Sequence, residues 1–103
     1  MLERRTRYLQ LAFNDDLATA IRIVPTLPQD PRIILEAGTP YIKREGLRGI
    51  STLRRLWPGM ILADLKTIDG GAEEVAMVHD AGAHAATVLG NCPTETLDNF
   101  ITT

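Results

Sequence analysis

The stretch ILADLKTIDGGAEEVAMVHDAGAHAATVLG, residues 61–90, contains the pattern that decides the fold. An apolar run at Ile61–Ala63 leads into a helical pattern that Gly82 closes, and a second apolar run begins at Ala85. Short apolar runs bounded by turn residues are typical of buried strands, and apolar residues three and four positions apart are typical of a helix. The stretch therefore predicts two strands joined by a helix, and such a crossover makes the strands parallel.

The same alternation continues towards both ends of the chain. Apolar runs begin at residues 9, 33, 61 and 85, so the repeats span 24, 28 and 24 residues. The runs that mark the predicted strands are Leu9–Phe13, Ile33–Leu35, Ile61–Ala63 and Ala85–Leu89. Repeated strand–helix units of this length favour parallel strands with right-handed crossovers.

Four helices are predicted from capping residues and apolar spacing. Asp15 or Asp16 caps the first helix, Pro58-Gly59 ends the second, Gly82 ends the third, and the fourth begins near Pro93. Their apolar faces are, in chain order, Leu17, Ala20, Ile21 and Val24; Leu47, Ile50, Leu53 and Leu56 or Trp57; Ala72, Val75, Ala76 and Ala81; and Leu97, Phe100 and Ile101.

The number of units sets the architecture. A complete barrel of eight such units has about 250 residues, whereas this chain has 103 residues and four compact units. We therefore expect an α/β fold that is half of a TIM (β/α)8 barrel, as one half-barrel domain over residues 1–103. Four strands leave two unpaired edges and cannot close a barrel. We expect a homo-oligomer, either two half-barrels in one eight-stranded ring or a homodimer through the third-strand region.

Composition and charge narrow the class of protein. The chain is 45% hydrophobic and 23% charged, as ordinary globular domains are. Its net charge of −2 gives no electrostatic reason to expect nucleic acid or an anionic membrane. No apolar run approaches the roughly 20 residues that span a bilayer, and the N-terminus lacks the apolar region of a signal peptide. Cys92 is the only cysteine, so we expect a cytoplasmic protein without an intramolecular disulfide.

Other chemically reactive residues have simpler explanations. His79 and His84 are five positions apart, not the three or four that align ligands on a helix, so a zinc site is not expected. No histidine stands in a motif relation to Cys92, which favours an inert thiol. Trp57, at the end of a helix, is best explained by core packing.

Polar residues stand where three successive predicted strands end: Asn14, Glu36, and Asp64 with Lys66. In barrels of this kind the reactive groups lie at the carboxyl ends of the strands. Residues two apart on a strand share a face, so Asp64 and Lys66 should both point into the barrel mouth. A simple salt bridge, with Asp69 as a helix cap, also explains these charges. Three polar strand ends in succession favour a functional site, because desolvating charges is costly without a partner.

Two segments resemble a known family. ILEAGTPYIKREGL, residues 34–47, and the stretch 61–90 resemble the orotidine 5′-phosphate decarboxylase superfamily. Within it they are most similar to the branch of hexulose-6-phosphate synthase and 3-keto-L-gulonate-6-phosphate decarboxylase. The patterns Glu-x-Gly-Thr-Pro and Asp-x-Lys-x-x-Asp occur in the family's order, and the resemblance covers Leu9 to Gly90, the N-terminal half of the family. Gly70-Gly71-Ala72 departs from the Ile-Pro-Asn-Thr that typically follows in the orotidine enzyme itself.

The resemblance implies a role for each of these polar residues. Glu36 and Asp64 match the carboxylates that hold Mg²⁺, a hard cation that prefers oxygen ligands. The ion stabilises a cis-enediolate formed from a ketose phosphate. Lys66 matches a lysine that flanking acids keep protonated beside the enediolate, and Asp69 matches an aspartate that reaches the neighbouring subunit's active site. The implied catalytic residues are Asp64, Lys66 and Asp69, and the implied substrate-binding residues are Asn14, Glu36 and Lys66.

Two features depart from the family pattern. The family's first strand ends in Asp, whereas Asn14 stands here, with Asp15 as the adjacent carboxylate. The family's second half, which binds the substrate phosphate and supplies further acid–base groups, has no counterpart in this chain. A Gly-rich phosphate loop is also absent from the sequence.

The resemblance implies a magnesium-dependent lyase of carbohydrate metabolism. The reaction of the hexulose-6-phosphate synthase type adds formaldehyde to ribulose 5-phosphate or runs in reverse. One alternative is a related decarboxylase of a sugar phosphate or of orotidine 5′-phosphate. Another is a truncated or split half-barrel that has no activity alone.

Overall fold

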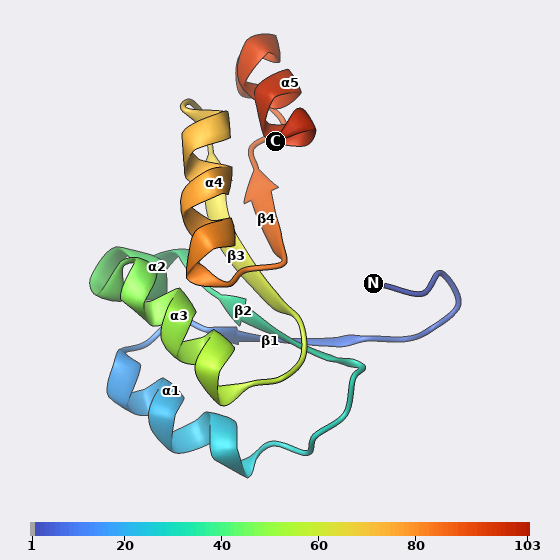
Figure 1. Cartoon of the computed structure of the whole chain (residues 1–103), viewed down its shortest axis with the longest axis vertical. Coiled ribbons are helices and arrows are strands. Elements are labelled where there is room, and N and C mark those ends of the chain that lie inside the picture. The colour runs from blue at the N-terminus through green and yellow to red at the C-terminus, as the bar shows by residue number, and fades with distance from the viewer. Residues whose placement is uncertain (1) are drawn as a thin grey trace.

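The computed structural model describes residues 2–103, which form one parallel sheet with strand order β1-β2-β3-β4 (Figure 1). The strands are β1 (Leu9–Phe13), β2 (Ile33–Ala37), β3 (Ile61–Thr67) and β4 (Ala85–Val88). The helices are α1 (Leu17–Ile23), the 3-10 helix η1 (Val24–Thr26), α2 (Thr39–Glu45), α3 (Leu47–Leu56), α4 (Gly71–Ala81) and α5 (Thr94–Thr102). The predicted α/β class and the four parallel strands are confirmed.

One face of the sheet packs against helices. Helices α1, α3 and α4 lie on the same side of the strands, with α3 between the other two (Figure 1). The strand side chains Leu35, Ile61 and Ala63 on this face are fully buried, and Ile50 and Leu53 of α3 are buried against them. Removing a Leu or Ile side chain of this size from water contributes about 1.5–3 kcal/mol, so this layer holds the fold together.

Helix α2 was not predicted, because its sequence TPYIKRE offers too few apolar residues to show a stripe. Tertiary contact explains why it forms. Tyr41 is fully buried, and its hydroxyl donates a hydrogen bond to the carbonyl oxygen of Gly49 at 2.8 Å. Burial, with the charge of Glu45 as a second cause, raises the pKa of Tyr41 to about 12. The buried phenol anchors α2 beside the carboxyl end of β2.

The predicted helices differ from the structure in detail. Asp16, rather than Asp15, caps α1, since its Oδ1 accepts a hydrogen bond from the amide of Thr19 at 2.9 Å. Four residues predicted to face the core are exposed instead, namely Ile21 (47%), Leu47 (40%), Ala76 and Ile101 (70%). Apolar character alone did not fix their orientation. None of the helices within residues 2–103 has both the length and the apolar character needed to cross a bilayer.

Strands β2 and β3 extend beyond the apolar runs that located them. Those runs end at Leu35 and Ala63, whereas the strands continue to Ala37 and Thr67. Polar residues interrupt the apolar run in both extensions. The apolar pattern therefore ends before the last hydrogen-bonded residues of each strand. Glu36, Asp64 and Lys66 therefore lie on strands, as the alternation along each strand predicted.

Gly38 joins β2 directly to α2 where the backbone passes very close to β1. Its amide donates to the carbonyl oxygen of Phe13 at 2.9 Å. A Cβ atom at this position would lie 1.8 Å from Oδ1 of Asn14 and 2.8 Å from the Phe13 oxygen. Only glycine allows this approach, which brings Thr39, the first residue of α2, to the edge of β3.

We expect Gly38→Ala to lower the free energy of unfolding by about 1–3 kcal/mol, because the new methyl group must displace the Asn14 side chain and the Phe13 backbone. Urea denaturation measures the change. Gly90→Ala is the matched control, since no atom lies within 4 Å of its Cβ position, and its effect should stay within about 0.5 kcal/mol. Equal stability of the two variants would contradict the close approach at Gly38.

Candidate active site

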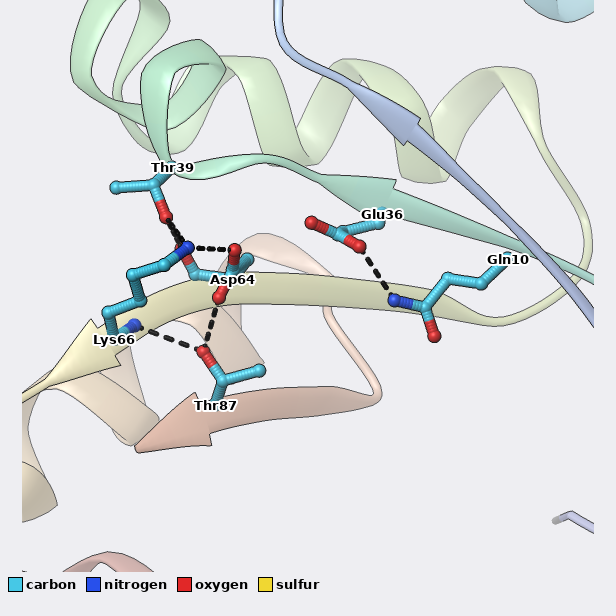
Figure 2. Close-up of polar contacts among 6 residues, drawn as sticks. All are labelled: Gln10, Glu36, Thr39, Asp64, Lys66 and Thr87. Carbon is cyan, nitrogen blue, oxygen red and sulfur yellow. Dashed lines mark hydrogen bonds and ion pairs between the residues drawn. The ribbon is translucent and has the colours of Figure 1, made fainter. Parts of the chain in front are cut away.

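Polar side chains gather on the face of the sheet opposite the helices (Figure 2). The register pairs Glu36 with Leu62, and alternation along β3 then places Asp64 on the same face as Glu36. Figure 2 shows Gln10, Glu36, Thr39, Asp64, Lys66 and Thr87 on this side, drawn from β1, β2, β3, β4 and the start of α2. The polar groups thus converge from every strand of the sheet.

Asp64 and Lys66 form an ion pair at the centre of this cluster. The Lys66 ammonium donates to Oδ2 of Asp64 and also to Oγ1 of Thr39, the latter at 2.8 Å. The Asp64 side chain is 17% exposed and the Lys66 side chain 53% exposed. The Asp64 side chain is therefore largely enclosed, while about half of the Lys66 side chain is open to solvent.

Two opposing effects act on the Asp64 carboxyl. Burial raises its pKa, but hydrogen bonds from Lys66 and Thr87 and the positive charge of Lys66 outweigh burial and hold the pKa below its ordinary value of 3.8. Asp64 is therefore ionised at neutral pH.

The backbone of Lys66 is unusual. Its φ angle is 49°, and it is the only non-glycine residue with positive φ among residues 2–103. Such a left-handed conformation costs an L-residue about 1–2 kcal/mol. It lies in a β-bulge, where the pairs Ala63–Ala86 and Thr67–Val88 are four residues apart on β3 but two apart on β4. The excess of two residues preserves the alternation, so Asp64 and Lys66 still share a face.

Two threonines, Thr39 and Thr87, bridge Lys66 and Asp64. Thr39 Oγ1 accepts from the Lys66 ammonium and donates to the Asp64 carbonyl oxygen at 2.7 Å. Thr87 Oγ1 accepts from the Lys66 amide at 3.0 Å and donates to Oδ1 of Asp64 at 2.6 Å. Sequence reasoning gave neither residue a role. No pattern within β4 marks Thr87, because its contacts depend on the register between β3 and β4.

Glu36 lies beside this pair on the neighbouring strand. Its Oε1 accepts a hydrogen bond from Nε2 of Gln10 at 2.6 Å. Within residues 2–103 no cluster of three His, Cys, Asp or Glu side chains could hold a metal ion. Glu36 and Asp64 nevertheless form a pair of oxygen donors on one face, and one or two carboxylates, completed by water and substrate oxygens, are what Mg²⁺ commonly uses. The donor set therefore fits the Mg²⁺ that the resemblance implies.

Asn14 and Asp69 lie apart from the hydrogen-bond network. Asn14 follows the end of β1 with its side chain against Gly38, and its carbonyl oxygen accepts from Nη1 of Arg44 at 2.7 Å. Asp69 is exposed in the turn between β3 and α4. The structure thus brings together Glu36, Asp64 and Lys66, but joins neither Asn14 nor Asp69 to them.

Four parallel strand–helix units with a charged cluster towards the carboxyl ends of the strands define a portion of a (β/α)8 barrel. Solved barrels of this class superpose closely on the chain. The 3-hexulose-6-phosphate synthase from Salmonella typhimurium aligns with a TM-score of 0.85 and 36% identity, over 92% of this chain and 46% of that one. KGPDC from Streptococcus mutans aligns with a TM-score of 0.82 and 26% identity, over 93% of this chain and 46% of that one.

The chain belongs to the Orotidine 5′-phosphate decarboxylase / HUMPS family, whose sequence profile matches residues 7–103. The bifunctional enzyme Fae/Hps from Methanococcoides burtonii is 46% identical over 96 residues, which are 91% of this chain and 24% of that protein. The Fae/Hps protein from Methanosarcina mazei is 43% identical over the same length. The chain therefore spans about a quarter of these curated relatives and somewhat less than half of the solved synthase. The predicted family and half-barrel architecture are confirmed.

We expect an NMR titration of the Asp64 carboxyl carbon to give a pKa below 3.8 and Lys66→Ala to raise it, because the substitution removes a hydrogen bond and a positive charge. Since the folded pKa is the lower one, the ionised carboxylate stabilises the fold fully above pH 3.8, and this contribution is lost as the pH falls through the folded value.

Lys43→Ala is the control for this titration. Lys43 is the chain's other lysine and is exposed on α2. We expect its removal to leave the Asp64 pKa unchanged. An Asp64 pKa that responds equally to both substitutions would show that the ion pair does not set it.

Proposed function

We propose that this chain carries the charge-stabilising part of a magnesium-dependent lyase of the hexulose-6-phosphate synthase type. The reaction joins formaldehyde to ribulose 5-phosphate or runs in reverse. The observation that carries the proposal is the Asp64–Lys66 ion pair, held beside Glu36 on the open face of the sheet. Similarity to a 3-hexulose-6-phosphate synthase supports the substrate class. The lone cysteine supports a reducing cytoplasm as the place of the reaction.

The geometry suits an intermediate that carries negative charge on oxygen. The Lys66 ammonium is held by Asp64 and Thr39 before any ligand arrives, so it stabilises an enediolate without reorganising. Ionised Asp64 keeps the ammonium directed into the site. Glu36 and Asp64 would hold Mg²⁺, which when bound supplies Lewis-acid stabilisation of oxygen anions.

A decarboxylase of a 3-keto sugar-acid phosphate is the second candidate. It is favoured by the close superposition on KGPDC. Loss of CO2 from such a substrate also leaves an enediolate, so the same lysine serves both reactions. Gly70-Gly71-Ala72, which differs from the pattern of the orotidine enzyme, makes orotidine 5′-phosphate the weakest of the substrates considered.

We expect the chain to release formaldehyde from hexulose 6-phosphate in the presence of magnesium and Lys66→Ala to reduce the rate by about 10²–10³-fold, the usual cost of removing one charge-stabilising donor. Lys43→Ala is the matched control and should retain the rate. A parallel assay of CO2 release from 3-keto-L-gulonate 6-phosphate distinguishes the second candidate. Identical formaldehyde release by the chain and by Lys66→Ala, including none from either, would remove the lyase proposal for this chain.

We also propose that the chain self-associates. Strands β1 and β4 are the two edges of the sheet, and each has one unpaired side. Beside β1 lies a groove of about 550 Å³ that reaches to α1, and Leu9 at the start of β1 is 55% exposed. These features support pairing of edges into an eight-stranded ring. The exposed Asp69 supports the other route, a dimer in which this carboxylate reaches the neighbouring site.

We expect sedimentation equilibrium at micromolar concentration to give at least twice the chain mass of 11.3 kDa. Leu9→Lys separates the two routes, because a charge on the β1 edge opposes strand pairing. Dissociation of this variant indicates the ring, and an intact dimer indicates the Asp69 route. A wild-type species of 11.3 kDa would contradict self-association.

A further inference from the structure

The geometry points to Thr87 as a positioning residue for Lys66. Its hydroxyl, on β4, holds the Lys66 backbone in the left-handed conformation from which the ammonium reaches Asp64. The consequence for catalysis rests on the proposed function, whereas the consequence for the Lys66 backbone rests on the contacts alone.

The direction of the two hydrogen bonds at Thr87 is fixed by chemistry. A threonine hydroxyl has one hydrogen to donate and can accept two hydrogen bonds. The Lys66 amide can only donate, so Thr87 Oγ1 accepts from it at 3.0 Å. The ionised Asp64 carboxylate can only accept, so the Thr87 hydrogen goes to its Oδ1 at 2.6 Å. One side chain therefore fixes both members of the ion pair.

The bulge in β3 explains why a side chain is needed here. Because β3 has two more residues than β4 between their paired positions, the Lys66 amide bonds a side chain rather than a carbonyl of the ladder. Lys66 is exposed, so water is the alternative acceptor, but the Thr87 hydroxyl, unlike water, fixes the direction in which the amide points. The Thr87 hydroxyl meets this need, and without it the left-handed conformation of Lys66 loses its support.

Thr39 also bridges Lys66 and Asp64, from the other side of β3. It accepts from the Lys66 ammonium at 2.8 Å and donates to the Asp64 carbonyl oxygen at 2.7 Å. Thr39 holds the end of the lysine side chain, and Thr87 holds the lysine backbone. Removing each hydroxyl should therefore have a different effect on Lys66, which makes the role of Thr87 separable by experiment.

The test is amide hydrogen exchange of Lys66 in the whole chain, followed by NMR. We expect Thr87→Val, which keeps the shape and removes the hydroxyl, to speed exchange of the Lys66 amide by about tenfold or more. Thr87→Ser, which restores the hydroxyl, should return exchange close to the wild-type rate. The Leu89 amide, which donates to the Thr67 carbonyl oxygen at 2.9 Å, reports whether the β3–β4 pairing survives.

Thr39→Val is the matched control, since it removes a bridging hydroxyl that does not touch the Lys66 amide. It should leave exchange at that amide unchanged. If Thr87→Val does not fold, Thr87→Ala compared with Thr87→Ser measures the same hydroxyl. Unchanged Lys66 exchange without the hydroxyl, or a serine variant as fast as the variant lacking it, would overturn the inference.

Formaldehyde release gives the kinetic readout. We expect Thr87→Val to lower kcat with little change in KM, because a displaced ammonium weakens stabilisation of the intermediate more than binding of the substrate. Thr87→Ser should recover most of kcat. One outcome is that Thr87→Val exchanges the Lys66 amide faster while neither the wild-type chain nor any variant shows lyase activity. That result supports the positioning role of Thr87 and contradicts the proposed function. Failure of the inference and failure of the proposed function are therefore distinguishable.

Discussion

Parallel pairing of the strands is the constraint on which the rest of this structure depends. Because all four strands run in one direction, their carboxyl ends meet at one edge of the sheet. Helices on one side leave the other side free for polar groups, and β3, flanked by β2 and β4, receives partners from both neighbours. Thr39 follows β2 and Thr87 lies on β4, so the Asp64–Lys66 pair receives hydrogen-bond partners from both sides of β3. Such partners offset the cost of partly burying the Asp64 carboxylate.

The sequence predicted those parts that follow from simple periodicity. Apolar runs located the four strands, and the two-residue spacing of Asp64 and Lys66 placed both side chains on one face. The parts it missed depend on tertiary contact. Helix α2 relies on the buried Tyr41, which no periodic pattern marks. Thr87 becomes important only through the β3–β4 register, and a register between strands cannot be read from either strand alone.

The candidate site holds its side chains in place by hydrogen bonds and leaves the lysine open to solvent. Thr39, Asp64 and Thr87 are half-buried, whereas about half of the Lys66 side chain is open to solvent. A preorganised positive charge at the open face is what an enzyme needs for an intermediate that gains negative charge during the reaction. The positive φ angle of Lys66 fits this arrangement. A strained backbone conformation persists only where surrounding contacts hold it in place.

The even number of extra residues in the β3 bulge has a consequence for the face that each side chain occupies. Inserting or deleting one residue between Ala63 and Thr67 would exchange the two faces of the strand, turning Lys66 towards the helices and Thr67 away from its Glu74 partner. Adding or removing two residues would keep every side chain on its present face. The even excess therefore keeps the Thr67 hydroxyl on the helix side, where it donates to Glu74, while Lys66 stays on the face opposite the helices.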